Sequence, residues 1–83
     1  LSNWTVAASD AAIIDAQCRF LKNAPYSDVN ACLNTCETIS GCNAVVYSDA
    51  QKICNLNRCN TFSPSITKNG YQGYISLTKK STG

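Results

Sequence analysis

Six cysteines are the residues of this chain whose type and spacing most clearly indicate a chemistry. They stand at positions 18, 32, 36, 42, 54 and 59, and the chain has neither a histidine nor a CxxC pair. Structural zinc sites mostly use histidine or CxxC pairs, so we interpret the cysteines as three disulfides and expect no metal site. Because disulfides persist in oxidising compartments, this interpretation predicts a secreted, cell-surface or periplasmic protein, and we expect it to be secreted and extracellular. Six cysteines can pair in 15 ways, and their spacing alone selects none of them.

Catalytic chemistry has few candidate residues in this sequence. The absence of histidine removes the histidine general base, the catalytic triads built on it and the commonest metal ligand. The acidic residues are scattered and show no pairing suited to glycoside hydrolysis. They are Asp10, Asp15, Asp28, Glu37 and Asp49. If all cysteines are paired, no thiolate nucleophile remains. We therefore expect no enzymatic activity and no cofactor.

The charge and hydropathy of the chain restrict its partners. A net charge of +2 with 14% charged residues does not suit a strong phosphate-binding surface, so nucleic acid is not an expected partner. The adjacent Lys79 and Lys80 are interpreted as a solubilising tail. No segment reaches the run of about 18 apolar residues that a membrane span needs. We expect Leu1 to be the mature N-terminus after signal-peptide cleavage, or the first residue of an excised fragment.

The length of 83 residues predicts one domain, residues 1–83. A domain of this size buries only about 60–65% of the surface that its unfolded chain exposes, and its core alone gives little net stability. Three disulfides, each contributing about 2–4 kcal/mol, would make up the difference.

The elements that must position these residues can be predicted in part. The clearest is a helix over about residues 28–39, capped by Ser27 or Asp28, with Val29, Cys32, Leu33 and Cys36 on one face. Gly41 suits the end of this helix, where a positive φ is favoured. Strands are expected at 3–8 and 13–14, and the runs 44–47 and 53–56 read as an antiparallel hairpin. Residues 60–70 are rich in turn formers and are expected to form a loop.

The last expected strand, 71–78, alternates between two faces. Tyr71, Ile75 and Leu77 would pack on the core, which predicts a sheet with one packed and one wet face. The outward face would carry Gln72, Tyr74, Ser76 and Thr78. If this strand lies at a sheet edge, its free backbone groups could also pair with a second chain.

The central part of the chain resembles the PAN/apple domains. The resemblance rests on the run Cys32-x-x-x-Cys36-x-x-x-x-x-Cys42-x-Ala44-x-x-Tyr47, followed by Cys54-x-Leu56, and covers roughly residues 28–57. It implies an α+β fold in which a single helix packs across a curved antiparallel sheet of about five strands. It also implies the disulfides Cys32–Cys54, Cys36–Cys42 and Cys18–Cys59.

The same resemblance implies a module that binds a protein or a glycan in adhesion or recognition. Tyr74, Gln72, Ser76, Thr78 and Tyr26 are the candidate binding residues, because exposed aromatic rings offer flat apolar faces to a sugar or a protein. For Trp4, Tyr47 and Tyr71 we favour packing in the core. Asn3 lies in the sequon Asn3-Trp4-Thr5 and is a candidate for N-glycosylation. The alternatives are a structural subunit that self-assembles into an extracellular filament or matrix, and an inhibitor or toxin-like effector that presents the 60–70 loop.

Overall fold

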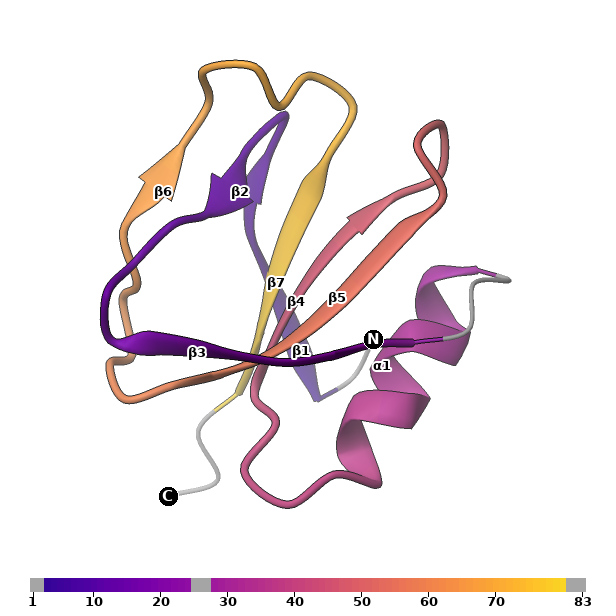
Figure 1. Ribbon diagram of the computed structural model, residues 1–83, viewed down its shortest axis with the longest axis vertical. Coiled ribbons are helices and arrows are strands. Elements are labelled where there is room, and N and C mark those ends of the chain that lie inside the picture. Colours follow the sequence, from indigo (N-terminus) through magenta and orange to yellow (C-terminus); the bar gives the residue numbers. More distant parts are fainter. Residues whose placement is uncertain (1–2, 25–27, 81–83) are drawn as a thin grey trace.

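The computed structural model describes residues 3–24 and 28–80, and these form one helix and two antiparallel sheets (Figure 1). The larger sheet has five strands in the order β1-β7-β4-β5-β3, and the smaller one pairs β2 with β6. The elements in chain order are β1 (Trp4–Ser9), β2 (Ala12–Ile13), β3 (Cys18–Asn23), α1 (Val29–Glu37), β4 (Ala44–Ser48), β5 (Ile53–Cys59), β6 (Ile66–Thr67) and β7 (Ile75–Lys79). This confirms the expected α+β fold.

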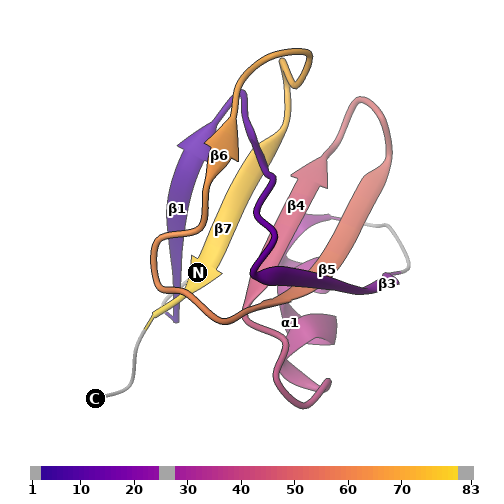
Figure 2. The same cartoon turned by 60° about the vertical axis from the view of Figure 1, so that its left-hand side comes forward.

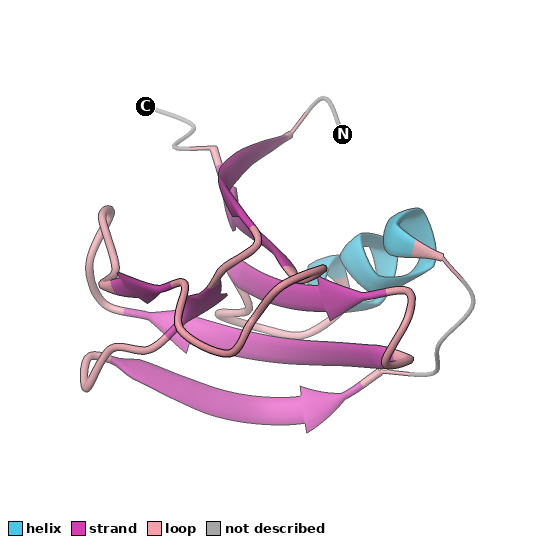
Figure 3. Ribbon diagram, turned by 90° about the horizontal axis from the view of Figure 1, so that it is seen from above, coloured by secondary structure: helices cyan, strands magenta, loops and turns pink. Residues whose placement is uncertain are grey.

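The helix α1 begins where the cap Asp28 predicts, but it ends at Glu37, two residues before the expected end. The Asp28 side chain accepts a hydrogen bond of 2.8 Å from the Ala31 backbone N–H, which satisfies one donor of the first turn. Thr38 is the C-cap, and Gly41 follows with φ +83°, a conformation that glycine adopts without steric cost. Cys32, Leu33 and Cys36 are buried, so the apolar stripe of the helix faces the sheet (Figure 3).

The main core lies between α1 and the five-stranded sheet. Val45, Leu56 and Leu77, from three neighbouring strands, are each at most 1% exposed and pack in this cluster. Trp4 on the edge strand β1 is also buried, and its indole Nε1–H donates a hydrogen bond of 3.1 Å to Glu37 Oε2 at the end of the helix. Trp4 and Tyr47 are therefore core residues, as the sequence predicted.

A second layer covers the other face of the sheet. The β2–β6 pair lies beside the sheet in Figures 1 and 2, and Ala12 and Ile13 pack against Ala44 and Val46 of β4. β4 is consequently buried on both faces, from Ala44 to Ser48. The prediction of one packed and one wet face is therefore wrong over the middle of the sheet.

The last strand differs from its prediction in length, position and exposure. β7 begins at Ile75, because Tyr71–Tyr74 form a turn in which the Tyr74 N–H bonds to the Tyr71 carbonyl at 3.1 Å. β7 lies between β1 and β4, so it is not an edge strand. Ser76, expected to face outward, is fully buried because the chain before β2 crosses over it, and its hydroxyl donates to the Ala11 carbonyl at 2.9 Å. The loop expected at 60–70 also contains β6.

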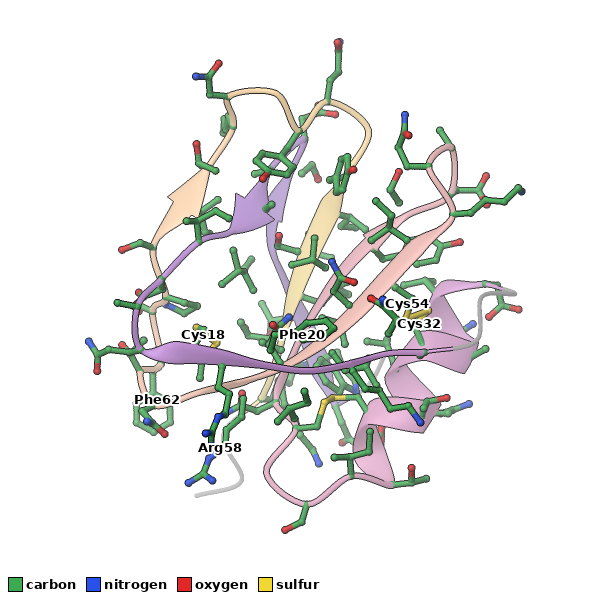
Figure 4. The ribbon with its side chains drawn as sticks, in the orientation of Figure 1. Cys18, Phe20, Cys32, Cys54, Arg58 and Phe62 are labelled. Carbon is green, nitrogen blue, oxygen red and sulfur yellow. A yellow bond between two sulfur atoms is a disulfide. The ribbon has the colours of Figure 1, made fainter. Side chains whose placement is uncertain are left out.

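The three disulfides join Cys18 to Cys59, Cys32 to Cys54 and Cys36 to Cys42, which are the pairs that the family resemblance implied. Two of them hold α1 and the segment after it in the main core, as the yellow bond between Cys32 and Cys54 shows in Figure 4. The third joins directly opposed residues of β3 and β5, with Cα atoms 3.9 Å apart. It belongs to the second layer.

Candidate binding groove

A groove of about 210 Å³ runs along the second face of the sheet, beside the β2–β6 layer. Its lining residues come from three parts of the chain that are distant in sequence: the segment around β2, the β4–β5 hairpin and the turn before β7. They are Ala12, Ile13, Ile14, Val46, Ile53, Asn55, Asn57, Tyr71 and Tyr74. A volume below the usual 300–1,000 Å³ of small-molecule sites suits one sugar ring or one large side chain of a partner, rather than a cofactor.

Two tyrosines form one wall of the groove. The rings of Tyr71 and Tyr74 meet edge to face, with centroids 5.1 Å apart and planes at 90°, the arrangement that aromatic quadrupoles favour. The turn that carries them is held by hydrogen bonds to residues that precede β2. The Gly73 N–H donates to Asp10 Oδ1 at 2.9 Å, and the Ala11 N–H donates to the Tyr74 carbonyl at 3.3 Å.

Both tyrosines are half-buried, and neither phenol hydroxyl is hydrogen-bonded to another described residue. A buried tyrosine hydroxyl usually finds a partner. The free hydroxyls beside an open groove therefore leave two donor and acceptor groups for a ligand.

Two asparagines on β5 form the opposite wall. Asn55 and Asn57 alternate with the buried Cys54 and Leu56, so strand periodicity turns their amides to the second face. The Asn57 amide makes one long hydrogen bond, 3.3 Å to the Asn55 carbonyl, and the Asn55 amide bonds to no described residue. Phe20 lies opposite Asn57 on β3 and is 56% exposed, so it continues the same surface (Figure 4).

The lining of this groove contains no ionisable carboxylate or basic side chain. Its polar groups are amides and phenols, which donate and accept hydrogen bonds without charge. Aromatic rings beside such groups bind flat apolar surfaces with a polar edge, such as the faces of a pyranose or of a peptide side chain. The arrangement suits recognition of a neutral group.

The sequence-predicted binding residues are not brought together as expected. Tyr74 lines the groove, and the exposed Gln72 lies on the same turn. Thr78 is half-buried and lines a separate hollow at the other end of β7, whereas the buried Ser76 cannot reach a partner. Tyr26 lies outside the described residues. Sequence analysis missed Asn55 and Asn57, although their alternation with Cys54 and Leu56 was a usable signal.

Asn3 is exposed in a turn at the start of the edge strand β1. Its backbone carbonyl accepts a hydrogen bond of 2.8 Å from the Lys80 N–H, while its side chain stays accessible. This placement is compatible with the predicted glycan.

A carboxylate on the surface ties the second layer together. The Ser65 N–H donates to Asp15 Oδ2 at 2.7 Å, and the Gln17 N–H donates to Oδ1 at 2.8 Å. These backbone hydrogen bonds, the one from Ser65 first, lower the pKa of the Asp15 carboxyl below its ordinary value. Asp15 thereby joins the segment after β2 to the segment before β6.

Comparison with protein families gives one match. The model of the PAN domain matches residues 14–81, which include both walls of the groove and all six cysteines. No curated protein and no solved structure matches the chain. Among the described residues, no helix has the length and apolar character needed to cross a membrane. Residues 3–24 and 28–80 also contain no group of three or more His, Cys, Asp or Glu side chains that could hold a metal ion.

Proposed function

The chain belongs to the PAN domain family, and we propose that it is an extracellular, non-catalytic recognition module that binds a protein or glycan through the groove beside Tyr71 and Tyr74. The observation that carries the proposal is the pair of half-buried tyrosines whose hydroxyls have no partner among the described residues, facing amides across an open groove. Folding alone does not need unbonded phenols at a solvent-accessible wall.

The chemistry of the groove favours binding over catalysis. Its lining has no carboxylate, lysine or histidine that could transfer a proton, and the cysteines of the chain are all paired. The Asp15 carboxyl, whose pKa is lowered, is engaged by two backbone N–H groups outside the groove. We accordingly assign the protein no enzymatic role.

Three disulfides support the extracellular assignment, because reducing compartments do not maintain such bonds. The two core clusters lie on the two faces of one sheet and share β4, which supports treating residues 1–83 as one domain.

The test compares ligand binding by the wild-type domain and by groove variants. The ¹⁵N-labelled domain would be titrated with glucose, galactose, mannose and N-acetylglucosamine, and also used to select from a displayed peptide library. Tyr74→Ala and Asn55→Ala should each weaken the binding of any ligand found in this way by about 1–2 kcal/mol in binding free energy. The matched control Asn34→Ala lies at an exposed position of α1, on the other side of the sheet, and should leave binding unchanged. If every sugar fails and every selected peptide binds Tyr74→Ala as tightly as wild type, the groove is not the recognition site.

A structural role in an extracellular assembly is the second candidate, favoured by the edge strand β1. Its residues from Thr5 to Ala7 are exposed, and the strand contains neither a charge nor a proline. Charged residues and prolines at an edge strand prevent it from pairing with another chain, and β1 has neither. A bulge between Val6 and Ala8 is the feature of this edge that opposes such pairing. Size-exclusion chromatography with light scattering on native material decides between the two roles. A discrete monomer supports the recognition module, and a large polymer supports the structural subunit.

A further inference from the structure

Phe62 is the most exposed large apolar residue that the structure describes, with 89% of its surface open to solvent. It lies in the segment between β5 and β6, which we call the Phe62 loop and define as residues 60–65, and Figure 4 shows it at the periphery of the molecule. A hollow of about 220 Å³ lies beside it, lined by Asn43, Cys59, Thr61, Phe62, Thr78, Lys79 and Lys80. Because the ring borders this hollow and still stays exposed, it adds little to the stability of the fold and is free to contact a partner.

The Phe62 loop is fixed where it begins. Cys59, the residue before the loop, is joined by its disulfide to Cys18 on the neighbouring strand β3. The Asn60 N–H donates a hydrogen bond of 3.0 Å to the carbonyl of Gln17, one residue before that cysteine. A covalent bond and a backbone hydrogen bond thus hold the start of the loop against residues 17–18.

The loop is also fixed where it ends. The Ser65 N–H donates to Asp15 Oδ2 at 2.7 Å, and the Ser65 carbonyl accepts from the Ile14 N–H at 2.9 Å. Pro64, one residue earlier, is buried, and its ring fixes its own φ. Both ends of the loop are therefore held by one segment of the chain, residues 14–18.

Between its fixed ends, the loop combines one apolar side chain with polar neighbours. The Ser63 N–H donates to Thr61 Oγ1 at 3.3 Å, a hydrogen bond that joins the residues on either side of Phe62. A flat protein interface would need several apolar residues around the ring, and apart from the buried Pro64 the other residues of the loop are Asn, Thr and Ser. A single aromatic side chain presented by a fixed loop instead matches a deep apolar pocket, where aromatic residues bind most strongly.

We propose that the Phe62 loop inhibits a serine protease by inserting Phe62 into an apolar specificity pocket. Serine proteases of the chymotrypsin type select a large apolar residue through such a pocket. A loop that is already held at both ends loses little conformational entropy when it binds, which gives a substrate-like segment the affinity of an inhibitor. Protease–inhibitor complexes mostly form in this way, with little movement of the backbone between the free and bound states.

The fixed ends also oppose completion of cleavage. Attack of the protease serine hydroxyl on the Phe62 carbonyl forms an ester and breaks the bond to the Ser63 nitrogen, which receives the proton of the serine through the protease histidine. Because Ser65 stays bonded to Ile14 and Asp15, the new amino group remains beside the ester. It can attack the ester and re-form the peptide bond before water hydrolyses it.

This site differs from the groove, so the two proposals can fail independently. No residue of the Phe62 loop lines the groove. Tyr74→Ala should therefore leave protease inhibition unchanged, and Phe62→Ala should leave the binding of groove ligands unchanged. The alternative of an inhibitor that presents the 60–70 loop is thereby narrowed to residues 60–65.

The experiment measures inhibition of chymotrypsin, trypsin and elastase by the whole domain, with a chromogenic peptide substrate for each protease. We expect inhibition of chymotrypsin alone, because trypsin carries an aspartate in its pocket and the pocket of elastase is small. Phe62→Ala should weaken inhibition by about a hundredfold or more and leave the melting temperature unchanged, since the ring is exposed. Phe62→Lys should transfer inhibition from chymotrypsin to trypsin. Phe20→Ala removes another exposed ring, on β3, and should change inhibition by less than about twofold.

Three results would overturn the proposal. Chymotrypsin activity that the domain leaves unchanged, or rapid complete cleavage after Phe62, would show that the loop is no inhibitor. An equal loss of inhibition in Phe20→Ala and Phe62→Ala would show that exposed rings act without a site. Asp15→Ala removes the acceptor of the Ser65 N–H and should speed cleavage between Phe62 and Ser63 by about tenfold, measured by mass spectrometry. An unchanged cleavage rate would contradict the role of the fixed ends.

Discussion

Replacing Asn43 tests how the end of the sheet is held together. Its side chain makes two hydrogen bonds to the backbone of Cys59, one through each amide atom, and so joins the start of β4 to the end of β5. Asn43→Ala removes both bonds and leaves the N–H and C=O of the buried Cys59 without these partners. Each net hydrogen bond contributes about 1 kcal/mol, and an unsatisfied buried group costs about 1–3 kcal/mol. Water in the adjacent hollow offsets part of this, so we expect a loss of about 2–4 kcal/mol in the free energy of unfolding.

That loss is large for this protein. A domain of this length has a net stability of about 4–12 kcal/mol, so Asn43→Ala should lower the melting temperature by about 10–30 °C. Asn57→Ala is the matched control, since it makes the same substitution on the neighbouring strand but removes a single bond of 3.3 Å. It should cost less than about 1 kcal/mol. Urea and thermal unfolding measured by circular dichroism would give both values. A loss in Asn43→Ala no greater than that in Asn57→Ala would refute the reasoning.

Three further predictions concern the cross-links, the sequon and the surface carboxylate. Peptide mapping without reduction should recover the three cystine pairs of the structure and no free thiol, and a Cys32–Cys36 peptide would contradict the fold. Expressed in a eukaryotic host, the protein should carry a glycan at the exposed Asn3 that Asn3→Gln removes, whereas an intact mass equal to the bare polypeptide with three disulfides would count against it. Because the folded pKa of Asp15 is lowered, its stabilising effect is present above the ordinary carboxyl pKa of about 3.9 and is lost as the pH falls through the lowered value. Amide exchange at Ser65 and Gln17 should accelerate below about pH 4 in wild type, and an equally steep acceleration in Asp15→Asn would refute this role.

Local signals in the sequence were sufficient for the helix and for the main core. Asp28 caps α1 through a contact three residues away, and the spacing of Cys32, Leu33 and Cys36 places them on one helical face. These features depend on neighbours within one or two turns. The disulfide pairs were different, because only the resemblance to a family selected them among the pairings that the spacing allows.

The second layer could not be predicted from local patterns, since it depends on contacts between distant residues. β2 and β6 have two residues each, too few to show a periodicity. They are held in place by the hydrogen bonds of Asp15 with Ser65, Asp10 with Gly73 and Ala11 with Ser76, which span 50 to 65 residues. One signal was nevertheless present. Ala44 to Tyr47 is continuously apolar, as expected for a strand covered on both faces, whereas the alternation around Ser76 indicated a wet face.

β5 shows how this small domain combines stability with recognition. Cys54 and Leu56 face the helix, where one forms a disulfide with α1 and the other is fully buried. Asn55 and Asn57 alternate with them and face the groove. Because the two sets point to opposite faces of one strand, the groove residues can change without altering the cross-linked core. Substitutions at Asn55 should therefore change ligand preference with little effect on unfolding, while Leu56→Ala should cost about 2–5 kcal/mol and leave the groove chemistry intact.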